Sequence, residues 1–149
     1  MANFAAKFSS ATIEPDQVRS FIAGLPALLE ESYSDRALTF YYGFDCNIHN
    51  DLTYKPMRVA LKVFSYFVED SIDRKIYEVG KTDMSIESPD SDWKILLCHE
   101  SDIHLEGEND EFIQKIIKAF PVFDFRSSDD WKAHYKVEAE TGRSSESEE

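Results

Sequence analysis

The side chains that could do chemistry gather in one stretch of the chain, between Asp83 and Glu111. One base, Lys94, stands there against ten acids, which are Asp83, Glu87, Asp90, Asp92, Glu100, Asp102, Glu106, Glu108, Asp110 and Glu111. Clustered carboxylates can bind calcium or attract a basic macromolecule. The segment lacks the alternating ligands, central glycine and closing glutamate of an EF-hand loop. The pattern therefore favours a basic partner over calcium, although a solvated sheet edge that deters aggregation would carry similar charges.

The same stretch holds the densest group of potential transition-metal ligands, Cys98, His99, Asp102 and His104, while Cys46 and His49 lie elsewhere. Their spacing matches no zinc motif, and one continuous strand would point Cys98 and His99 to opposite faces. Cys98 also extends an apolar run, which is typical of a small core residue. We therefore expect neither a metal site nor a cofactor.

Motifs for covalent catalysis are missing. A cysteine could pair with a histidine as a nucleophile, but no nucleophile elbow surrounds either cysteine. The 5 glycines are scattered and form no phosphate-binding loop. We predict no catalytic residue, and an enzyme of unrecognised chemistry stays as a third alternative.

The overall charge restricts the class of partner. The formal net charge is −13 at pH 7, which repels nucleic acid and anionic membrane surfaces and favours steered encounter with a basic protein. The chain has no apolar run of roughly 18 residues that could cross a membrane, and its beginning does not resemble a secretory signal. We expect a cytoplasmic protein without nucleic-acid or membrane partners.

Apolar periodicity predicts the elements that must position these residues. We expect a helix, kinked or divided by Gly24 and Pro26, between about Pro15 and Tyr33. The strongest helix pattern follows the cap Asn109-Asp110-Glu111, and a last helix follows Ser127-Ser128. Strands are predicted at 38–44, 76–79, 84–86, 93–99, 102–106 and 122–125, with a loop at Asp45–Lys55.

One segment, Pro56 to Ile72, is ambiguous. Its apolar residues fit one face of a helix opened by Pro56, and its β-branched and aromatic content suits a long strand equally. We choose the helix.

These elements predict a single α+β domain with helices packed on a mainly antiparallel sheet. Its limits are a flexible N-terminus at 1–13, the domain at 14–138 and a disordered acidic tail at 139–149.

The resulting functional hypothesis is a non-enzymatic binding protein of the immunity type, which neutralises a basic toxin such as a nuclease by stoichiometric binding. The predicted contact residues are Asp90, Asp102, His104, Glu106 and Glu108, with Tyr41 and Trp93 as aromatic anchors. The alternative is a secretion-type chaperone that acts as a homodimer. A stable homodimer with exposed apolar patches would favour the chaperone, and a compact monomer would favour the inhibitor.

Overall fold

The computed structural model describes residues 6–43 and 56–147. The predicted loop at Asp45–Lys55, with Cys46 and His49, lies outside the described residues.

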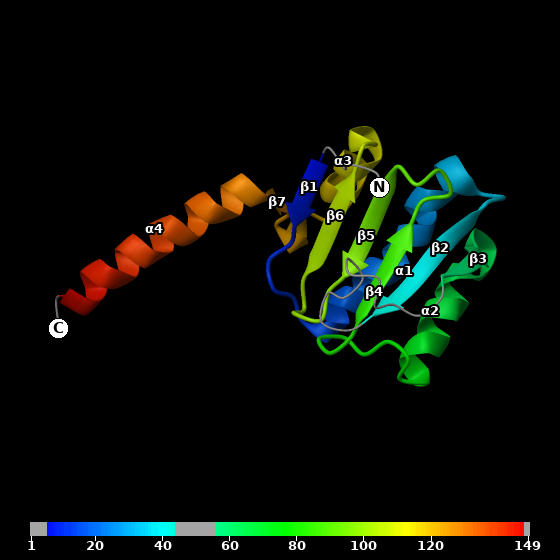
Figure 1. Cartoon of the computed structure of the whole chain (residues 1–149), viewed down its shortest axis with the longest axis horizontal. Helices are drawn as coiled ribbons and strands as arrows, with labels where there is room; N and C mark the ends of the chain where they lie inside the picture. Colours follow the sequence, from blue (N-terminus) through cyan, green and yellow to red (C-terminus); the bar gives the residue numbers. More distant parts are fainter. Residues whose placement is uncertain (1–5, 44–55, 148–149) are drawn as a thin grey trace.

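A single antiparallel sheet forms the framework of the domain (Figure 1). Its seven strands have the spatial order β3-β2-β4-β5-β6-β1-β7. The strands are β1 (Ala6–Ser9), β2 (Ala37–Gly43), β3 (Met57–Ala60), β4 (Asp83–Glu87), β5 (Trp93–Leu97), β6 (Ile103–Gly107) and β7 (Arg126–Ser127). The prediction of an α+β domain with a mainly antiparallel sheet is confirmed.

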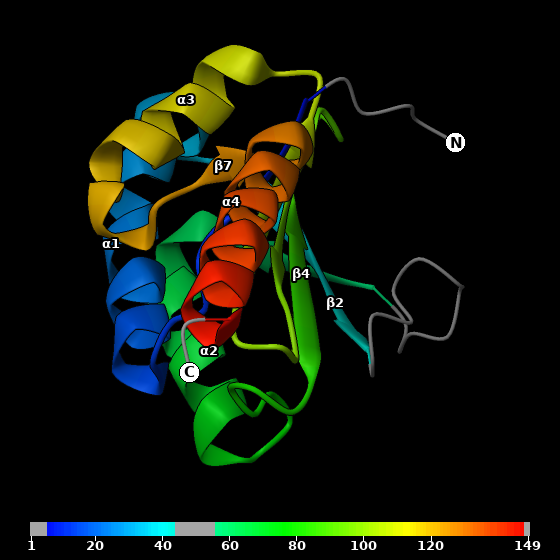
Figure 2. The ribbon, with the colours of Figure 1, turned by 90° about the vertical axis from the view of Figure 1, so that its left-hand side faces the viewer.

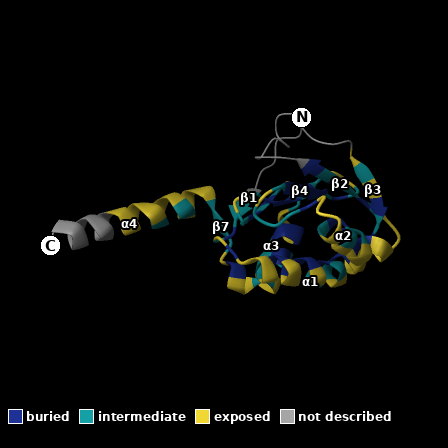
Figure 3. Cartoon of the chain, turned by 90° about the horizontal axis from the view of Figure 1, so that it is seen from below, coloured by how far each residue is buried: buried dark blue, intermediate teal, exposed yellow. Residues whose placement is uncertain are grey.

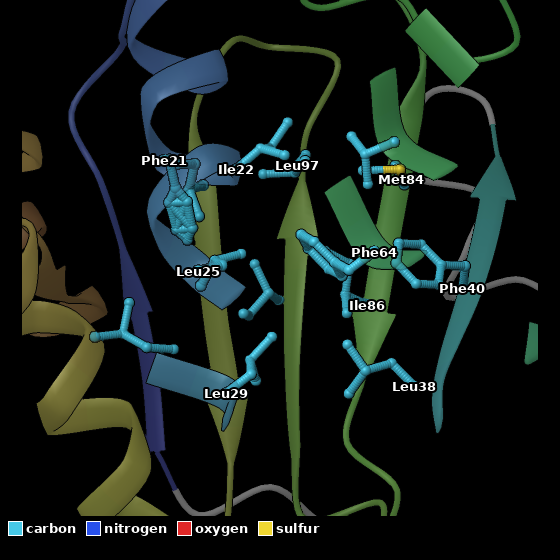
Figure 4. Close-up of a cluster of buried hydrophobic side chains, with 14 of the residues drawn as sticks. Phe21, Ile22, Leu25, Leu29, Leu38, Phe40, Phe64, Met84, Ile86 and Leu97 are labelled. Atoms are coloured by element: carbon cyan, nitrogen blue, oxygen red, sulfur yellow. The ribbon is translucent and has the colours of Figure 1, made fainter. Parts of the chain in front are cut away.

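Three helices cover one face of the sheet, and Figure 2 shows them on the same side. They are α1 (Pro15–Tyr33), α2 (Phe64–Asp73) and α3 (Asp110–Ala119). The hydrophobic core lies between these helices and the sheet. In the close-up of Figure 4, side chains of α1 and α2 meet those of the central strands, and the labelled residues are Phe21, Ile22, Leu25, Leu29, Phe64, Leu38, Phe40, Met84, Ile86 and Leu97. Burial of each such side chain contributes about 1.5–3 kcal/mol to stability.

Helix α1 is continuous through Gly24 and Pro26, which corrects the alternative of two short helices. Its start is fixed by a capping box between Glu14 and Gln17. Gly24 admits the ring of Phe120, because a Cβ at that position would lie 2.9 Å from the Phe120 ring. The apolar stripe of α1 is buried along its whole length, so packing outweighs the local effect of Pro26.

The ambiguous segment 56–72 contains both predicted structures. Its first residues form β3, a turn of 3-10 helix spans Leu61–Val63, and α2 follows. The helix that we chose therefore begins only at Phe64. β3 pairs with β2 along the register Ala37↔Ala60 to Phe40↔Met57, and this non-local pairing decides the strand.

Two predicted short strands are wrong, because backbone N–H groups of these segments form hydrogen bonds within local turns instead of with another strand. At 76–79, the backbone N–H groups of Ile76 and Tyr77 donate to the carbonyl of Ser71 and close the end of α2. At 122–125, Pro121 opens a turn of 3-10 helix, and Asp124 adopts a left-handed φ of 52°.

The chain ends also differ from expectation. The predicted flexible N-terminus contains β1, which pairs with β6 on one side and β7 on the other. Helix α4 (Ser128–Ser147) extends into the stretch that we expected to be disordered. It projects away from the body of the domain, and its described residues are mostly exposed (Figure 3). Trp131 anchors its base by donating from Nε1 to the carbonyl of Ser9 at 2.7 Å.

Candidate functional site

Four of the predicted contact residues, Tyr41, Asp102, His104 and Glu106, belong to the side of the sheet opposite α1, α2 and α3. Ile103 and Leu105 point into the core, so the alternation of β6 places Asp102, His104 and Glu106 on the other side. In β2, Phe40 and Tyr42 belong to the core, which places Tyr41 on that same side. The strand register then determines their neighbours.

Glu106 lies within a row of alternating charge. Lys7 of β1 is its partner on one side and Lys94 of β5 is its partner on the other. Glu87 of β4 is the next partner of Lys94. Opposite charges on neighbouring strands stabilise a sheet, so this row is balanced and is not an acidic patch.

Tyr41 lies toward the other edge of this face. It pairs with Ser85 of β4, and burial together with the nearby Glu87 carboxylate raises the pKa of its hydroxyl. Leu96, the next neighbour of Ser85 on β5, is only 3% exposed. Tyr41 therefore lies at one end of a largely buried row that continues through Ser85 and Leu96 to His104.

The turn between β5 and β6 gathers a set of residues that we term the Cys98 cluster: Asp83, Cys98, His99, Asp102 and His104. Within it, one ligand atom from each of Cys98, Asp102 and His104 lies within 4.8 Å of the other two. The same holds for Asp83, Cys98 and His99. Strand β5 ends at Leu97, and the chain then turns back through Ser101, whose φ is 63°. Cys98 and His99 therefore converge, which corrects the inference that a continuous strand separates them.

Each half of the Cys98 cluster has its own supporting hydrogen bonds. Asp83 is fully buried, and its Oδ1 accepts from the backbone N of His99 at 2.7 Å and contacts His99 Nδ1 at 3.0 Å. On the other side, Nδ1 of His104 is 2.7 Å from Ser9 Oγ, and its Nε2 is 3.3 Å from Asp102 Oδ1. That second contact is an ion pair without good hydrogen-bond geometry, and it is the contact that Asp102 Oδ1, a buried oxygen, makes with His104.

The electrostatics of the His104 side chain follow from these contacts. Burial by itself lowers the pKa of His104, but contact with Asp102 and Cys98 outweighs it and raises the pKa to about 10. Burial raises the pKa of Asp102, and the interaction with His104 outweighs that effect, so its pKa is lowered. The pair is therefore a carboxylate and an imidazolium.

The arrangement does not suit a thiol–imidazole–carboxylate relay. In such a relay the thiol and the carboxylate contact opposite nitrogens of the imidazole. Here the carboxylate is nearest to Nε2, and the Ser9 hydroxyl takes Nδ1. Cys98 is also only 2% exposed, which keeps its sulfur from a substrate.

The opposite end of the strands carries a different set of acids, which we term the acidic end: Asp90, Asp92, Glu108, Asp110 and Glu111. The turn between β4 and β5 meets the connection from β6 to α3 here, because the carbonyl of Asp92 accepts from the backbone N of Glu108 at 2.9 Å and of Asn109 at 3.0 Å. Arg36 pairs with Asp90 at 2.6 Å, and this contact lowers the pKa of Asp90. Within the described part of the chain, no ion pair engages Glu108 or Glu111.

The predicted contact residues are thus divided. Asp90 and Glu108 belong to the acidic end, whereas Asp102 and His104 belong to the Cys98 cluster at the other end of β6. Trp93 is 1% exposed and points into the core, where its Nε1 donates to the Tyr33 hydroxyl at 3.0 Å and its ring stacks on Phe112. Trp93 is therefore not a surface anchor.

Sequence reasoning grouped Cys98, His99, Asp102 and His104 as potential metal ligands, but it missed the contribution of Asp83 and the convergence of the side chains at one turn. The one signal that could have indicated it is the turn-forming run His99-Glu100-Ser101 between two apolar strands, which ends β5 before Cys98. The contribution of Asp83 had no such signal, because it comes from the start of a different strand.

Among the described residues, no helix combines the length and the apolar character needed to cross a membrane. No protein-family model, curated protein or solved structure matches the chain.

Proposed function

We propose that the protein is a non-enzymatic binding protein whose acidic end docks onto a basic protein by direct stoichiometric contact. The observation that carries this proposal is the concentration of exposed carboxylates where the turn between β4 and β5 meets the start of α3. A surface of this kind speeds the association with a basic partner and excludes acidic ones.

The remaining charges at this end reinforce its character. Its bases include Arg36 and Lys115, which are already engaged by Asp90 and Glu31. Asp110 and Glu111 occupy the first turn of α3, where they also stabilise the positive end of the helix dipole. Glu108 precedes that helix and has no such structural role, so its charge is the most informative one to change.

The partner class follows from the sign of the charge. Enzymes that act on nucleic acid are basic because they must neutralise phosphates, so an acidic protein can cover their active sites. An immunity-type inhibitor of a basic toxin such as a nuclease, acting in the cytoplasm, is the specific form of this proposal.

The experiment is affinity capture from the source cell with the tagged full chain, at low salt and then with a high-salt wash. The test variant is Glu108→Lys. Its matched control is Asp73→Lys, which makes the same charge change at an exposed residue that ends α2, where a cation is compatible with the helix dipole.

We expect the wild type and Asp73→Lys to recover one basic protein in equal amount, released by salt. Glu108→Lys should bind that protein at least about 10-fold more weakly, since like charges then meet at the interface. Equal recovery by both variants, or recovery that ignores salt, would reject the acidic end as the docking surface.

The alternative of a homodimeric secretion-type chaperone has one observation in its favour. Helix α4 exposes the apolar side chains of Tyr135 and Val137, with 61% and 62% of their surface accessible. Sedimentation velocity distinguishes the two proposals, because a chaperone of this class would be a stable dimer and the inhibitor a monomer.

A further inference from the structure

The Cys98 cluster brings three different metal-ligating groups together at one turn. The thiol of Cys98, the carboxylate of Asp102 and the imidazole of His104 each present one ligand atom within 4.8 Å of the others. In a tetrahedral zinc site with ordinary bond lengths, neighbouring ligand atoms are roughly 3.3–3.7 Å apart. The carboxylate and imidazole atoms are already 3.3 Å apart. The sulfur lies within 4.8 Å of both atoms, so a contraction of at most about 1 Å would complete the set at zinc-like spacing.

The hydrogen bonds around these residues already hold the ligand side chains in orientations that suit metal binding. Histidines that bind metal through one nitrogen hold the other in a hydrogen bond, which fixes the ring orientation. Ser9 Oγ supplies that contact to Nδ1 of His104, which leaves Nε2 beside Asp102. Asp102 Oδ1 is buried and faces His104 Nε2 without good hydrogen-bond geometry, so a cation between the two atoms would replace a weak contact.

The other half of the cluster is better suited to support than to ligation. Asp83 Oδ1 contacts two nitrogens of His99, one in the backbone and one in the ring, so its lone pairs are committed. His99 in turn lies beside the sulfur, with Nδ1 at 3.6 Å from Cys98 Sγ. This contact holds the sulfur in position at the turn.

One ligand of the set, Asp102, borders the surface of the protein. Asp102 lines a surface depression at the base of α4, together with Ser9, Ser10, Trp131 and Tyr135. A water molecule in that depression would supply the fourth ligand of a tetrahedral site.

We propose that Cys98, Asp102 and His104 bind a transition-metal ion of the zinc class, with Asp83 and His99 as positioning residues. The thiolate and the carboxylate balance the two positive charges of the ion. Sulfur and imidazole nitrogen select zinc-like ions over calcium or magnesium, which prefer oxygen ligands. The ion would join the end of β5 to the start of β6 and act as a structural staple, because Cys98 is buried away from solvent.

The test uses Co²⁺ as a spectroscopic probe on the full chain after dialysis against a chelator. We expect about one equivalent of Co²⁺ to bind, with the visible bands of tetrahedral coordination and a thiolate charge-transfer band. Zn²⁺ should displace the probe and raise the melting temperature as its concentration increases. Absence of saturable binding, or an octahedral spectrum without the thiolate band, would overturn the proposal.

Variants assign the ligands. Cys98→Ser should abolish the charge-transfer band, and His104→Gln should abolish tetrahedral binding. His99→Gln should weaken Zn²⁺ binding by about 10–100-fold without removing the band, as expected for a positioning residue. The control is His134→Gln, because His134 lies on α4, pairs with Glu138 and is not a member of the Cys98 cluster.

Circular dichroism of each metal-free variant separates loss of ligation from loss of folding. Unchanged Co²⁺ spectra in folded Cys98→Ser or His104→Gln protein would place the ion elsewhere and reject this site.

Discussion

The acidic end and the Cys98 cluster lie at opposite ends of the same strands. Both contain carboxylates, but the surroundings of those carboxylates differ. At the acidic end, Glu108 and Glu111 are exposed, and no ion pair engages them within the described residues. In the Cys98 cluster, Asp83 is fully buried and Asp102 has only 18% of its side chain exposed beside His104. One end can attract a macromolecule at long range, whereas the other can only hold an ion or a proton at short range.

The difference teaches that the density of acids along a chain does not specify their chemistry. The chemistry of an acid depends on the side chains that the turns of the sheet bring next to it. The turn between β4 and β5 meets Asn109 and Arg36, which are polar surface residues. The turn between β5 and β6 meets Ser9 and the buried start of β4.

The largest expected effect concerns the core residue Trp93, which begins β5 next to the acidic end. Trp93→Ala should lower the free energy of unfolding by about 3–5 kcal/mol, because it leaves a cavity against Phe112 and an unpaired Tyr33 hydroxyl. Urea denaturation measures the change. Trp93→Phe should destabilise less and leave partner capture intact, and loss of capture by a stable Trp93→Phe protein would restore Trp93 as an anchor.

The next largest effect should be a destabilisation confined to the acidic end. A methyl group at Gly107 would lie 2.4 Å from the carbonyl oxygen of Asp92, so Gly107→Ala should destabilise the protein by about 1–3 kcal/mol. Hydrogen exchange should rise at 88–92 and 108–111 more than at 98–102. Gly24→Ala is the control, since only the movable ring of Phe120 opposes its methyl group. Equal destabilisation by both variants would contradict this account.

A smaller effect should appear at the Cys98 end. Ser10 is buried, and its Oγ accepts from the backbone N of Ile103 at 2.9 Å. Ser10→Ala leaves that N–H unsatisfied at the start of β6 and should cost about 1–3 kcal/mol. Thermal denaturation measures it against Ser20→Ala, which removes only an exposed hydrogen bond to Asp16. If the two variants had the same melting temperature, the hydrogen bond of Ser10 would not stabilise the start of β6.

The smallest expected effect is on the pKa of Asp90 at the acidic end. Arg36→Ala should return the pKa of Asp90 upward to its ordinary range, as measured by NMR titration of the carboxyl group. The lowered pKa favours the folded state above the ordinary carboxyl pKa, and this contribution is lost as the pH falls through the lowered value. Because the pair is exposed, the melting temperature should not change measurably at neutral pH. Arg19→Ala, which breaks the exposed pair with Glu69, should leave the pKa of Asp90 unchanged.

The elements that were predicted well are those whose signals are local. Helix α3 has an apolar face and a cap in which Asn109 accepts from the backbone N of Phe112, and both features are readable from neighbouring residues. The alternation of β6 is likewise local, and its buried residues Ile103 and Leu105 were expected.

The elements that were predicted poorly depend on distant partners. β3 is a strand because β2 lies beside it, although its residues also fit the helix pattern that α2 completes. β1 is ordered because β6 and β7 lie on either side of a segment that looked flexible by composition. Local propensity gives way to such pairing because the backbone groups of a strand are satisfied only by another strand.

The sequence by itself determined the acid excess, the apolar stripes of the main helices and the α+β class, since these depend on composition and short spacing. Only the tertiary structure decided which acids become neighbours. In an antiparallel sheet the chain reverses at every turn, so successive turns alternate between the two ends of the strands. Asp90 and Glu108 therefore meet at one end although a whole hairpin separates them in sequence. Asp102, only six residues before Glu108, joins Asp83 and Cys98 at the other end.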